Sequence, residues 1–162
     1  MPISSRKTRV PALAAALALA SLAFVASGAS QAQGSKEADA AVRYRESLMT
    51  VVVANFAPLG AMASGKAPFD AKLFQSRAER VAFMATIAPD VFPAVSKTGA
   101  NTKAKPEIWD NKAEFDKLMK DFGDKTAALA VASKSGNLDT IKPVFGAAAQ
   151  TCKACHDKFK AE

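Results

Sequence analysis

Hydrophobic positions along this 162-residue chain recur every three or four residues from about residue 36 onward. No stretch shows the sustained alternation, with a period of two, that a half-exposed strand requires. Alanine and other good helix formers dominate the same region. The pattern therefore predicts an all-α protein.

Four segments carry an apolar stripe, and the spacing predicts helices over about 36–64, 70–88 and 107–135 and from about 139 to near the C terminus. Helices of this length with short connections favour an antiparallel up-and-down four-helix bundle. The expected inward positions of the four helices, in chain order, are Leu48, Val52, Phe56, Leu59 and Ala63; Phe74, Ala78, Val81, Ala85 and Ala88; Phe115, Leu118, Phe122 and Leu129; and Leu138, Ile141, Phe145, Ala148, Cys152, Cys155 and Phe159.

Proline, glycine and short polar residues mark the expected helix ends. Pro58 predicts a kink in the first helix because proline lacks the backbone N–H. Asp70 is expected to cap the second helix, and Asp139 the last one. The stretch between Pro89 and Pro106 is rich in turn residues and is expected to be irregular. A loop of this length in a small domain is often functional.

The N-terminal segment has the three-part layout of a secretory signal. Arg6, Lys7 and Arg9 come first, and an apolar run of about 16 residues follows. Small residues near Ala32 then supply a cleavage point. The alternative, a membrane anchor, is disfavoured because the run is shorter than the roughly 20 residues that a span requires. We expect a signal peptide over 1–32 and a mature domain over 33–162, exported to the periplasm with no membrane span after processing.

The net charge and its distribution argue against nucleic-acid binding and exclude little else. The full chain carries a net charge of +7, from 22 Lys and Arg against 15 Asp and Glu. Removing the three basic residues of the signal leaves +4, since 22 − 3 − 15 = 4. The remaining basic residues are scattered among acids and form no stripe, so no nucleic-acid partner is expected.

One five-residue run holds both cysteines and the sole histidine of the chain: Cys152-Lys153-Ala154-Cys155-His156. This is the C-x-x-C-H pattern of covalent c-type haem attachment. On a helix, positions i and i+3 lie on one side, so both thiols can reach the two vinyl groups of one porphyrin. The adjacent imidazole can then reach the iron.

Three other interpretations compete with haem attachment. A Cys152–Cys155 disulfide is possible after export, but it would leave the histidine beside it by coincidence. A thioredoxin-like redox pair needs a βαβ context, which the pattern lacks. A zinc site needs four ligands, and only three residues of the usual soft types are present.

With no second histidine, a sixth iron ligand can only be methionine, lysine, a small molecule or nothing. Met49 lies one turn after Arg45, which suits a thioether over the iron and a guanidinium at a haem propionate. The alternatives are core packing for Met49 and a solvated face for Arg45. Three other methionines are better explained as core residues: Met62, Met84 and Met119.

The motif near the C terminus resembles class II cytochrome c, the cytochrome c prime family, and the similarity extends from Asp39 to Lys160. Familiar cytochromes c differ in having an early attachment motif. The matching stretches are Tyr44-Arg45-Glu46-Ser47, Ala67-Pro68-Phe69-Asp70, Lys105-Pro106-Glu107-Ile108-Trp109 and Cys152-Lys153-Ala154-Cys155-His156-Asp157.

The resemblance implies a left-handed four-helix bundle, a homodimer in the bacterial periplasm, and one covalent haem c. It implies thioether links at Cys152 and Cys155 and an axial histidine at His156. It also implies that Arg45 contacts a propionate and that the loop before Pro106 runs beside the haem edge. Two further residues fall at positions that can contribute to this edge: Glu46 and Lys103.

Members of the cytochrome c prime family differ at the position that corresponds to Met49. In one branch a bulky residue here crowds an empty coordination site that takes nitric oxide or carbon monoxide. In another branch a methionine in this region binds the iron, and the protein is an electron carrier. Lys160 stands where many members have arginine beside the imidazole, which leaves a basic role in proximal gas binding in doubt.

The sequence thus predicts a haem c protein that carries electrons by Fe(III)/Fe(II) cycling. The alternative function is the binding or sequestration of nitric oxide or carbon monoxide. A third possibility is a haem-free bundle stapled by a disulfide. No enzyme activity is expected, because no acid–base pair or nucleophile suited to an organic substrate is evident. The redox partner protein is unknown.

Overall fold

The computed structural model describes the backbone from Leu13 and the side chains from Gly34 to Glu162. The chain divides into two compact units, residues 1–35 and 36–162, and the second unit contains the bundle. The predicted signal segment and its cleavage point at Ala32 lie outside the described side chains and stay predictions.

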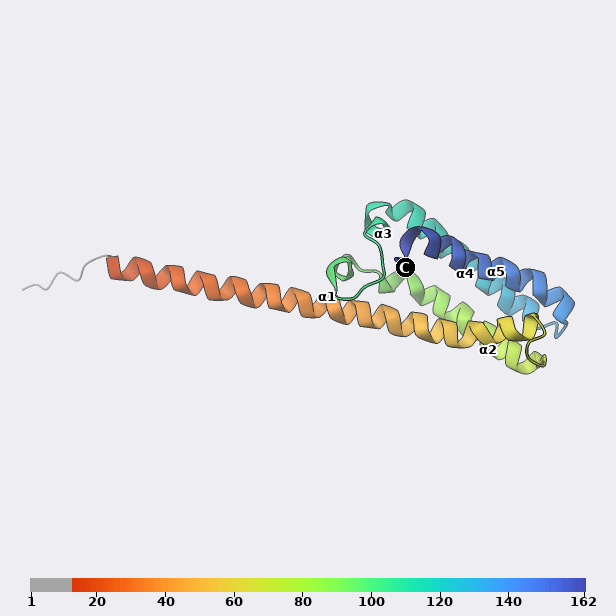
Figure 1. The fold of residues 1–162 in the computed structure, drawn as a ribbon. Coiled ribbons are helices and arrows are strands. Elements are labelled where there is room, and N and C mark those ends of the chain that lie inside the picture. Colours follow the sequence, from red (N-terminus) through yellow and green to blue (C-terminus); the bar gives the residue numbers. More distant parts are fainter. Residues whose placement is uncertain (1–12) are drawn as a thin grey trace, which may run out of the picture. The chain divides into compact units, whose positions relative to one another are not determined.

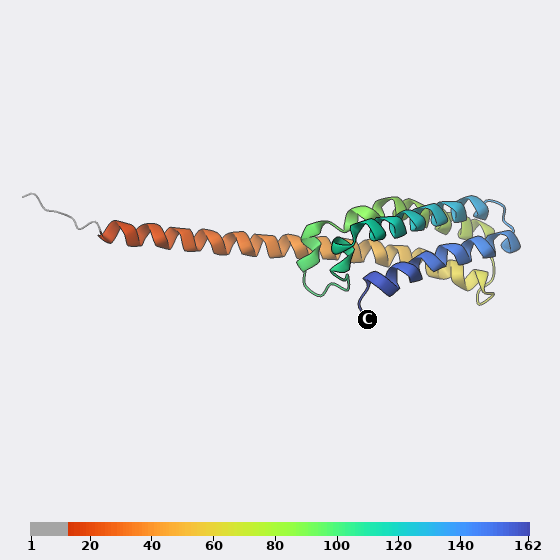
Figure 2. The same cartoon turned by 90° about the horizontal axis from the view of Figure 1, so that it is seen from above.

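Within 36–162 the C-terminal part of one helix and three further helices run alternately in opposite directions (Figures 1 and 2). This is the predicted up-and-down four-helix bundle. Its helices are α1 (Leu13–Ala63), α2 (Ala71–Ile87), α4 (Lys112–Ser133) and α5 (Leu138–Phe159). Shorter elements between α2 and α4 are the 3-10 helices η1 (Ala88–Val91) and η2 (Ala94–Thr98) and the single turn α3 (Glu107–Asp110).

Three local predictions need correction. The third helix is broken at Asn111, whose φ of −120° and ψ of 54° leave the helical region between α3 and α4. The stretch expected to be irregular contains two 3-10 helices. Asp139 does not cap α5, because the Oδ1 of Asn137 accepts the backbone N–H of Asp139 at 2.9 Å. The cap at Asp70 is confirmed, with Leu73 N donating to its Oδ1 at 3.0 Å.

Pro58 lies inside α1, and the helix continues beyond it to Ala63. Proline has no N–H to donate to the carbonyl four residues earlier, which is that of Ala54. Nη1 of Arg77, on α2, donates to this carbonyl oxygen at 3.0 Å. A side chain from the neighbouring helix thus replaces the missing hydrogen bond.

The core consists of two clusters along the bundle. The motif-end cluster contains Val52, Val81, Met84, Ala85, Ala88, Ile108, Phe115, Met119, Phe122 and Phe159. The far cluster contains Leu59, Met62, Phe74, Ala78, Leu129, Ile141 and Ala148. Each cluster draws residues from α1, α2, α4 and α5, which confirms the predicted stripes as the core. Phe56 packs against both clusters and stacks on Phe145 with 4.8 Å between ring centroids.

Among the described residues, Gly34–Ala63 is the one helical segment long and apolar enough, by length and composition, to cross a membrane. A core helix of a soluble bundle passes the same test. Val52, Leu59 and Met62 of this segment are buried in the two clusters. The bundle core therefore accounts for these buried residues, whereas Val51 and Val53 of the same segment are 49% and 61% exposed.

Candidate functional site

Cys152 and Cys155 lie one turn apart on α5, near the end of the bundle where α3 and the C terminus are found (Figure 1). Both side chains are partly buried and pack against the motif-end cluster. Both thiols are free, so the alternative of a Cys152–Cys155 disulfide is not present in the structure. The two cysteines continue the apolar stripe of α5, as the spacing predicts.

Burial keeps both thiols protonated. It raises the pKa of Cys152, partly opposed by hydrogen bonding with Thr151. Burial, with a contribution from Cys152, raises the pKa of Cys155 to about 11. Reactive redox cysteines have lowered pKa values in electropositive surroundings. The environment therefore disfavours a thioredoxin-like role for this pair.

His156 is exposed at the edge of the same turn. Its imidazole borders a surface hollow lined also by Lys105, Asp157 and Lys160. Partial burial lowers the pKa of His156, the charge of Lys160 lowers it further, and Asp157 opposes them. The imidazole is therefore neutral at pH 7, the form in which a ring nitrogen can bind a metal.

The C-terminal end of α5 is joined to the segment before α3. Ala104 and Lys160 form an antiparallel bridge. Lys105 N donates to the carbonyl of Phe159 at 2.9 Å, and Ala161 N donates to that of Lys103 at 2.8 Å. These bonds place the loop before Pro106 beside the end of α5, directly after the motif.

Arg45 is buried, with 5% of its surface exposed, so a solvated face is the wrong interpretation for this residue. Its Nη1 donates to Ser96 Oγ at 2.8 Å and its Nη2 to Thr102 Oγ1 at 2.6 Å. The guanidinium carbon lies 5.0 Å from the centroid of the Phe92 ring. Burial lowers the pKa of Arg45, while the nearby Glu46 raises it. Arginine still remains charged at neutral pH.

No ion pair of Arg45 with a carboxylate is present in the described part of the chain. Both side-chain oxygens that accept its N–H groups belong to neutral hydroxyls. A buried cation of this kind is a strong partner for an anion. The arrangement fits the carboxylate of a haem propionate.

Met49 is partly buried and packs against the motif-end cluster. The other two predicted edge residues are exposed. Lys103 donates through Nζ to the backbone oxygen of Glu162. The backbone carbonyl of Glu46 accepts a hydrogen bond from Thr50 Oγ1 at 2.7 Å. Met84 and Met119 are core residues of the motif-end cluster, and Met62 of the far cluster, as predicted.

Sequence reasoning missed Ser96, Thr102 and Phe92. All three contact Arg45 from the segment that was expected to be irregular. No helical periodicity applies there, and serine and threonine are common turn residues, so the sequence does not mark them as partners of an arginine. Only the folded path of the segment brings them to the guanidinium.

The donor set fits a haem and does not fit a bare metal ion. No group of three or more His, Cys, Asp and Glu capable of holding a metal is found in the described residues. The zinc alternative therefore has no support among residues 34–162. Two protonated thiols one turn apart, a neutral imidazole next to them and a buried cation match the vinyl groups, iron and carboxylate of one porphyrin.

Residues 40–160 match the family model described as cytochrome C′. The chain belongs to the cytochrome c′ family. It is 37% identical over 123 residues to cytochrome c′ of Rubrivivax gelatinosus, covering 74% of this chain and 93% of the relative. It is also 33% identical over 119 residues to cytochrome c-556 of Agrobacterium tumefaciens, covering 72% and 90%. This protein is accordingly a haem protein of that family.

Solved structures agree with this assignment. A cytochrome c prime from Shewanella frigidimarina superimposes with a TM-score of 0.74 at 42% identity, covering 77% of this chain and 97% of that one. Two variants of the Alcaligenes xylosoxidans protein are also similar. One is a nitric oxide complex, with a TM-score of 0.71, 29% identity and coverage of 77% and 97%. The other has carbon monoxide bound, with a TM-score of 0.69, 30% identity and coverage of 75% and 94%.

Proposed function

We propose that this chain is an exported cytochrome that holds one covalent haem c and carries single electrons. The observation that supports this most is that both thiols and the imidazole lie on one turn of α5, the thiols against the motif-end cluster and the imidazole exposed beside them. Export is supported by the N-terminal segment, with cleavage near Ala32 and a mature domain over 33–162. The family is typically periplasmic, and we propose that compartment here.

Each residue of the site has a distinct task in this proposal. Cys152 and Cys155 would form the thioether links, and their partial burial would hold the attached group against the motif-end cluster. His156 provides a neutral ring nitrogen as axial ligand, because its pKa is lowered. A haem c bound there supplies reversible exchange between Fe(III) and Fe(II). Arg45 would offset the negative charge of a propionate and so reduce the desolvation free energy of placing that carboxylate near the core.

A second candidate function is the binding or sequestration of nitric oxide or carbon monoxide. It is favoured by the similar Alcaligenes xylosoxidans structures that hold these gases. Met49 decides between the two, because it packs partly buried at this end of the bundle. A methionine bound to iron would exclude the gas, whereas a methionine that only crowds the iron would admit it.

We expect no enzyme activity toward organic substrates, because no acid–base pair or nucleophile suited to such a substrate is evident in the sequence and the one histidine, His156, is the proposed axial ligand. Glu46 and Lys103 are proposed only as minor contributors at the haem edge. Lys103 would have to leave the oxygen of Glu162 to take part.

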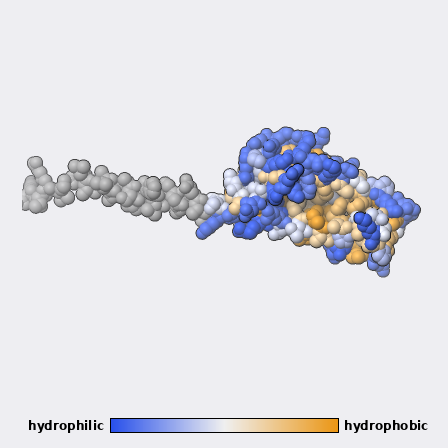
Figure 3. Space-filling view, in the orientation of Figure 1, coloured by the Kyte–Doolittle hydropathy of each residue, from blue (hydrophilic) through white to orange (hydrophobic). Residues whose placement is uncertain are grey.

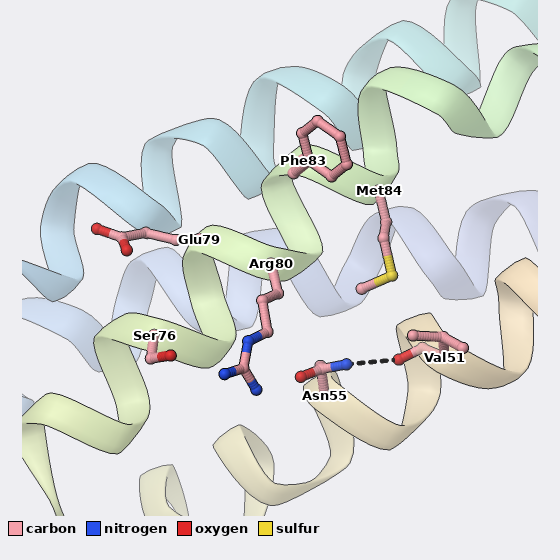
Figure 4. A pocket seen from close by; sticks show the side chains of 7 residues that line it. All are labelled: Val51, Asn55, Ser76, Glu79, Arg80, Phe83 and Met84. Atoms are coloured by element: carbon pink, nitrogen blue, oxygen red, sulfur yellow. Dashed lines mark hydrogen bonds between the residues drawn. The ribbon is translucent and has the colours of Figure 1, made fainter.

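We further propose a homodimer that uses α1 and α2. Figure 3 shows a broad apolar area on one face of the 36–162 unit. Between α1 and α2 lies a groove bordered by Val51 and Phe83, which are 49% and 66% exposed (Figure 4). Sedimentation of Phe83→Glu tests this proposal, with Val131→Glu as control because Val131 is 68% exposed on α4. Only the former should yield monomers.

The visible spectrum of dithionite-reduced protein, before and after carbon monoxide, tests the function. A low-spin spectrum that resists the gas supports a dedicated electron carrier with Met49 as sixth ligand. A five-coordinate spectrum that changes promptly with the gas supports the second function. Met49→Ala then separates the roles: loss of a ligand gives a large low-to-high-spin change, and loss of packing gives faster or tighter gas binding.

A further inference from the structure

Ser96, in η2, is fully buried. Its Oγ donates to the carbonyl of Pro93 at 2.8 Å and accepts Nη1 of Arg45 at 2.8 Å. A hydroxyl has one hydrogen, and Pro93 takes it. The lone pairs of Ser96 are therefore fixed toward the guanidinium.

The second Nη of Arg45 is held from the other end of the same segment. Thr102 Oγ1 accepts Nη2 at 2.6 Å and also accepts the N–H of Ala104 at 3.1 Å. Two acceptors, one on each Nη, fix the plane of the guanidinium as well as its position. The ring of Phe92 lies against the same group.

The segment that carries Ser96 is itself anchored to α1. A Cβ on Gly99 would lie 2.4 Å from Val42 Cγ2 and 2.8 Å from the carbonyl oxygen of Ala38, so the backbone passes close to the helix. The next residue, Ala100, donates its N–H to Asp39 Oδ1 at 2.7 Å. These contacts lie on the two helical turns before Arg45. They keep Ser96 at a fixed distance from the guanidinium.

We propose that Ser96 is a positioning residue for Arg45, which it holds in the orientation needed to pair with a haem carboxylate. The inference rests on the proposed function, because it presupposes the haem. Ser96 itself need not contact the haem. Its effect would pass through the guanidinium, and this distinguishes it from the residues of the motif.

The electrostatic consequence is a change in reduction potential. An ionised carboxylate near iron favours Fe(III), the more positive state, and a guanidinium held against it offsets that preference. Without the Ser96 oxygen, Nη1 loses its fixed acceptor, and the guanidinium can move off the carboxylate. Ser96→Ala should therefore lower the midpoint potential.

Ser133 offers a matched control. It is 1% exposed, and its Oγ donates to the carbonyl three residues earlier, that of Ala130, at 2.7 Å. Ser96 makes the same kind of bond to Pro93, and its additional bond from Arg45 is the difference. Both Ser96→Ala and Ser133→Ala should lower thermal stability, the first by more because Nη1 of Arg45 also loses its acceptor, and the first alone should shift the potential.

The experiment measures midpoint potentials of periplasmically matured S96A, S133A, R45A and S96A/R45A, after the intact mass has shown haem in each. We expect S96A to shift the potential in the same direction as R45A and by less. The double variant should match R45A alone, because Ser96 acts through Arg45. Equal potentials for S96A, S133A and the unaltered protein would overturn the inference. Absence of haem from the unaltered protein would instead overturn the proposed function.

Discussion

The two ends of this bundle are packed differently. In the far cluster six of the seven residues are completely buried, and Met62 is 3% exposed. In the motif-end cluster Val52, Met84, Met119 and Phe122 keep between 5% and 8% of their surface exposed. Nine partly buried apolar residues pack against that cluster, among them Leu48, Met49, Trp109, Leu118 and both cysteines, whereas five pack against the far cluster.

The difference concerns which end has apolar surface left to pack against another group. Side chains of the far cluster meet one another and bury almost all of their surface. The motif end presents thiols, methionines and aromatic edges that can pack against a flat apolar group. We infer that the chain alone completes the packing of the far end, whereas the motif end leaves apolar surface for the haem.

The largest effect is expected from Leu129→Ala in the far cluster, because Leu129 is fully buried. Truncation should lower the free energy of unfolding by about 3–5 kcal/mol, from lost burial and the resulting cavity. Chemical denaturation measures this change. Val131→Ala, two residues along α4 and 68% exposed, is the control and should change stability by less than about 0.5 kcal/mol.

Leu118→Ala sharpens the comparison, because Leu118 is also on α4 but is only partly buried at the motif end. Without haem its cost should be about 1–2 kcal/mol, below that of Leu129→Ala. With haem attached the two costs should approach each other. If Leu118→Ala costs as much as Leu129→Ala in the haem-free Cys152→Ala/Cys155→Ala chain, the two ends do not differ in the way inferred.

A smaller loss of stability is expected when the carbonyl of Ala54 loses its hydrogen bond. Arg77 donates to this carbonyl in place of the N–H that Pro58 lacks. Arg77→Ala should cost about 1–2 kcal/mol in unfolding experiments, because the carbonyl loses its donor. In a Pro58→Ala background the cost should fall, since Ala at 58 supplies its own N–H. Equal costs in both backgrounds would show that the two residues are not coupled.

The smallest effect concerns helix capping. Asp70 caps α2 and Asn137 caps α5 by accepting backbone N–H groups, whereas Asn111 makes no such bond at the start of α4. Asp70→Ala should therefore cost about 1 kcal/mol in thermal or chemical unfolding. Asn111→Ala should cost less. The reverse order would contradict the assignment of the caps.

Much of the fold follows from periodicity. Leu59, Phe74, Leu129 and Ile141 were predicted to face inward and are fully buried. The break at Asn111 was missed because the apolar stripe of the third helix continues on both sides of it. The spacing of apolar residues shows which face of a helix is buried. A local change in backbone angles can leave that spacing intact and so escape prediction.

The candidate site was predictable to the extent that its residues are neighbours in sequence. Cys152, Cys155 and His156 share one helical turn, so their geometry follows from spacing alone. Arg45 was left undecided between a solvated face and a haem contact. Its partners Ser96 and Thr102 come from a segment more than 50 residues away, which no helical pattern could place.

The central claim is covalent attachment of one haem to the motif end, and the intact mass under denaturing conditions tests it most directly. Protein matured in a periplasm should show the mature chain plus one haem that survives unfolding. Cys152→Ala/Cys155→Ala should show the chain alone. A haem that dissociates on unfolding, or a double variant that retains it, would contradict the account.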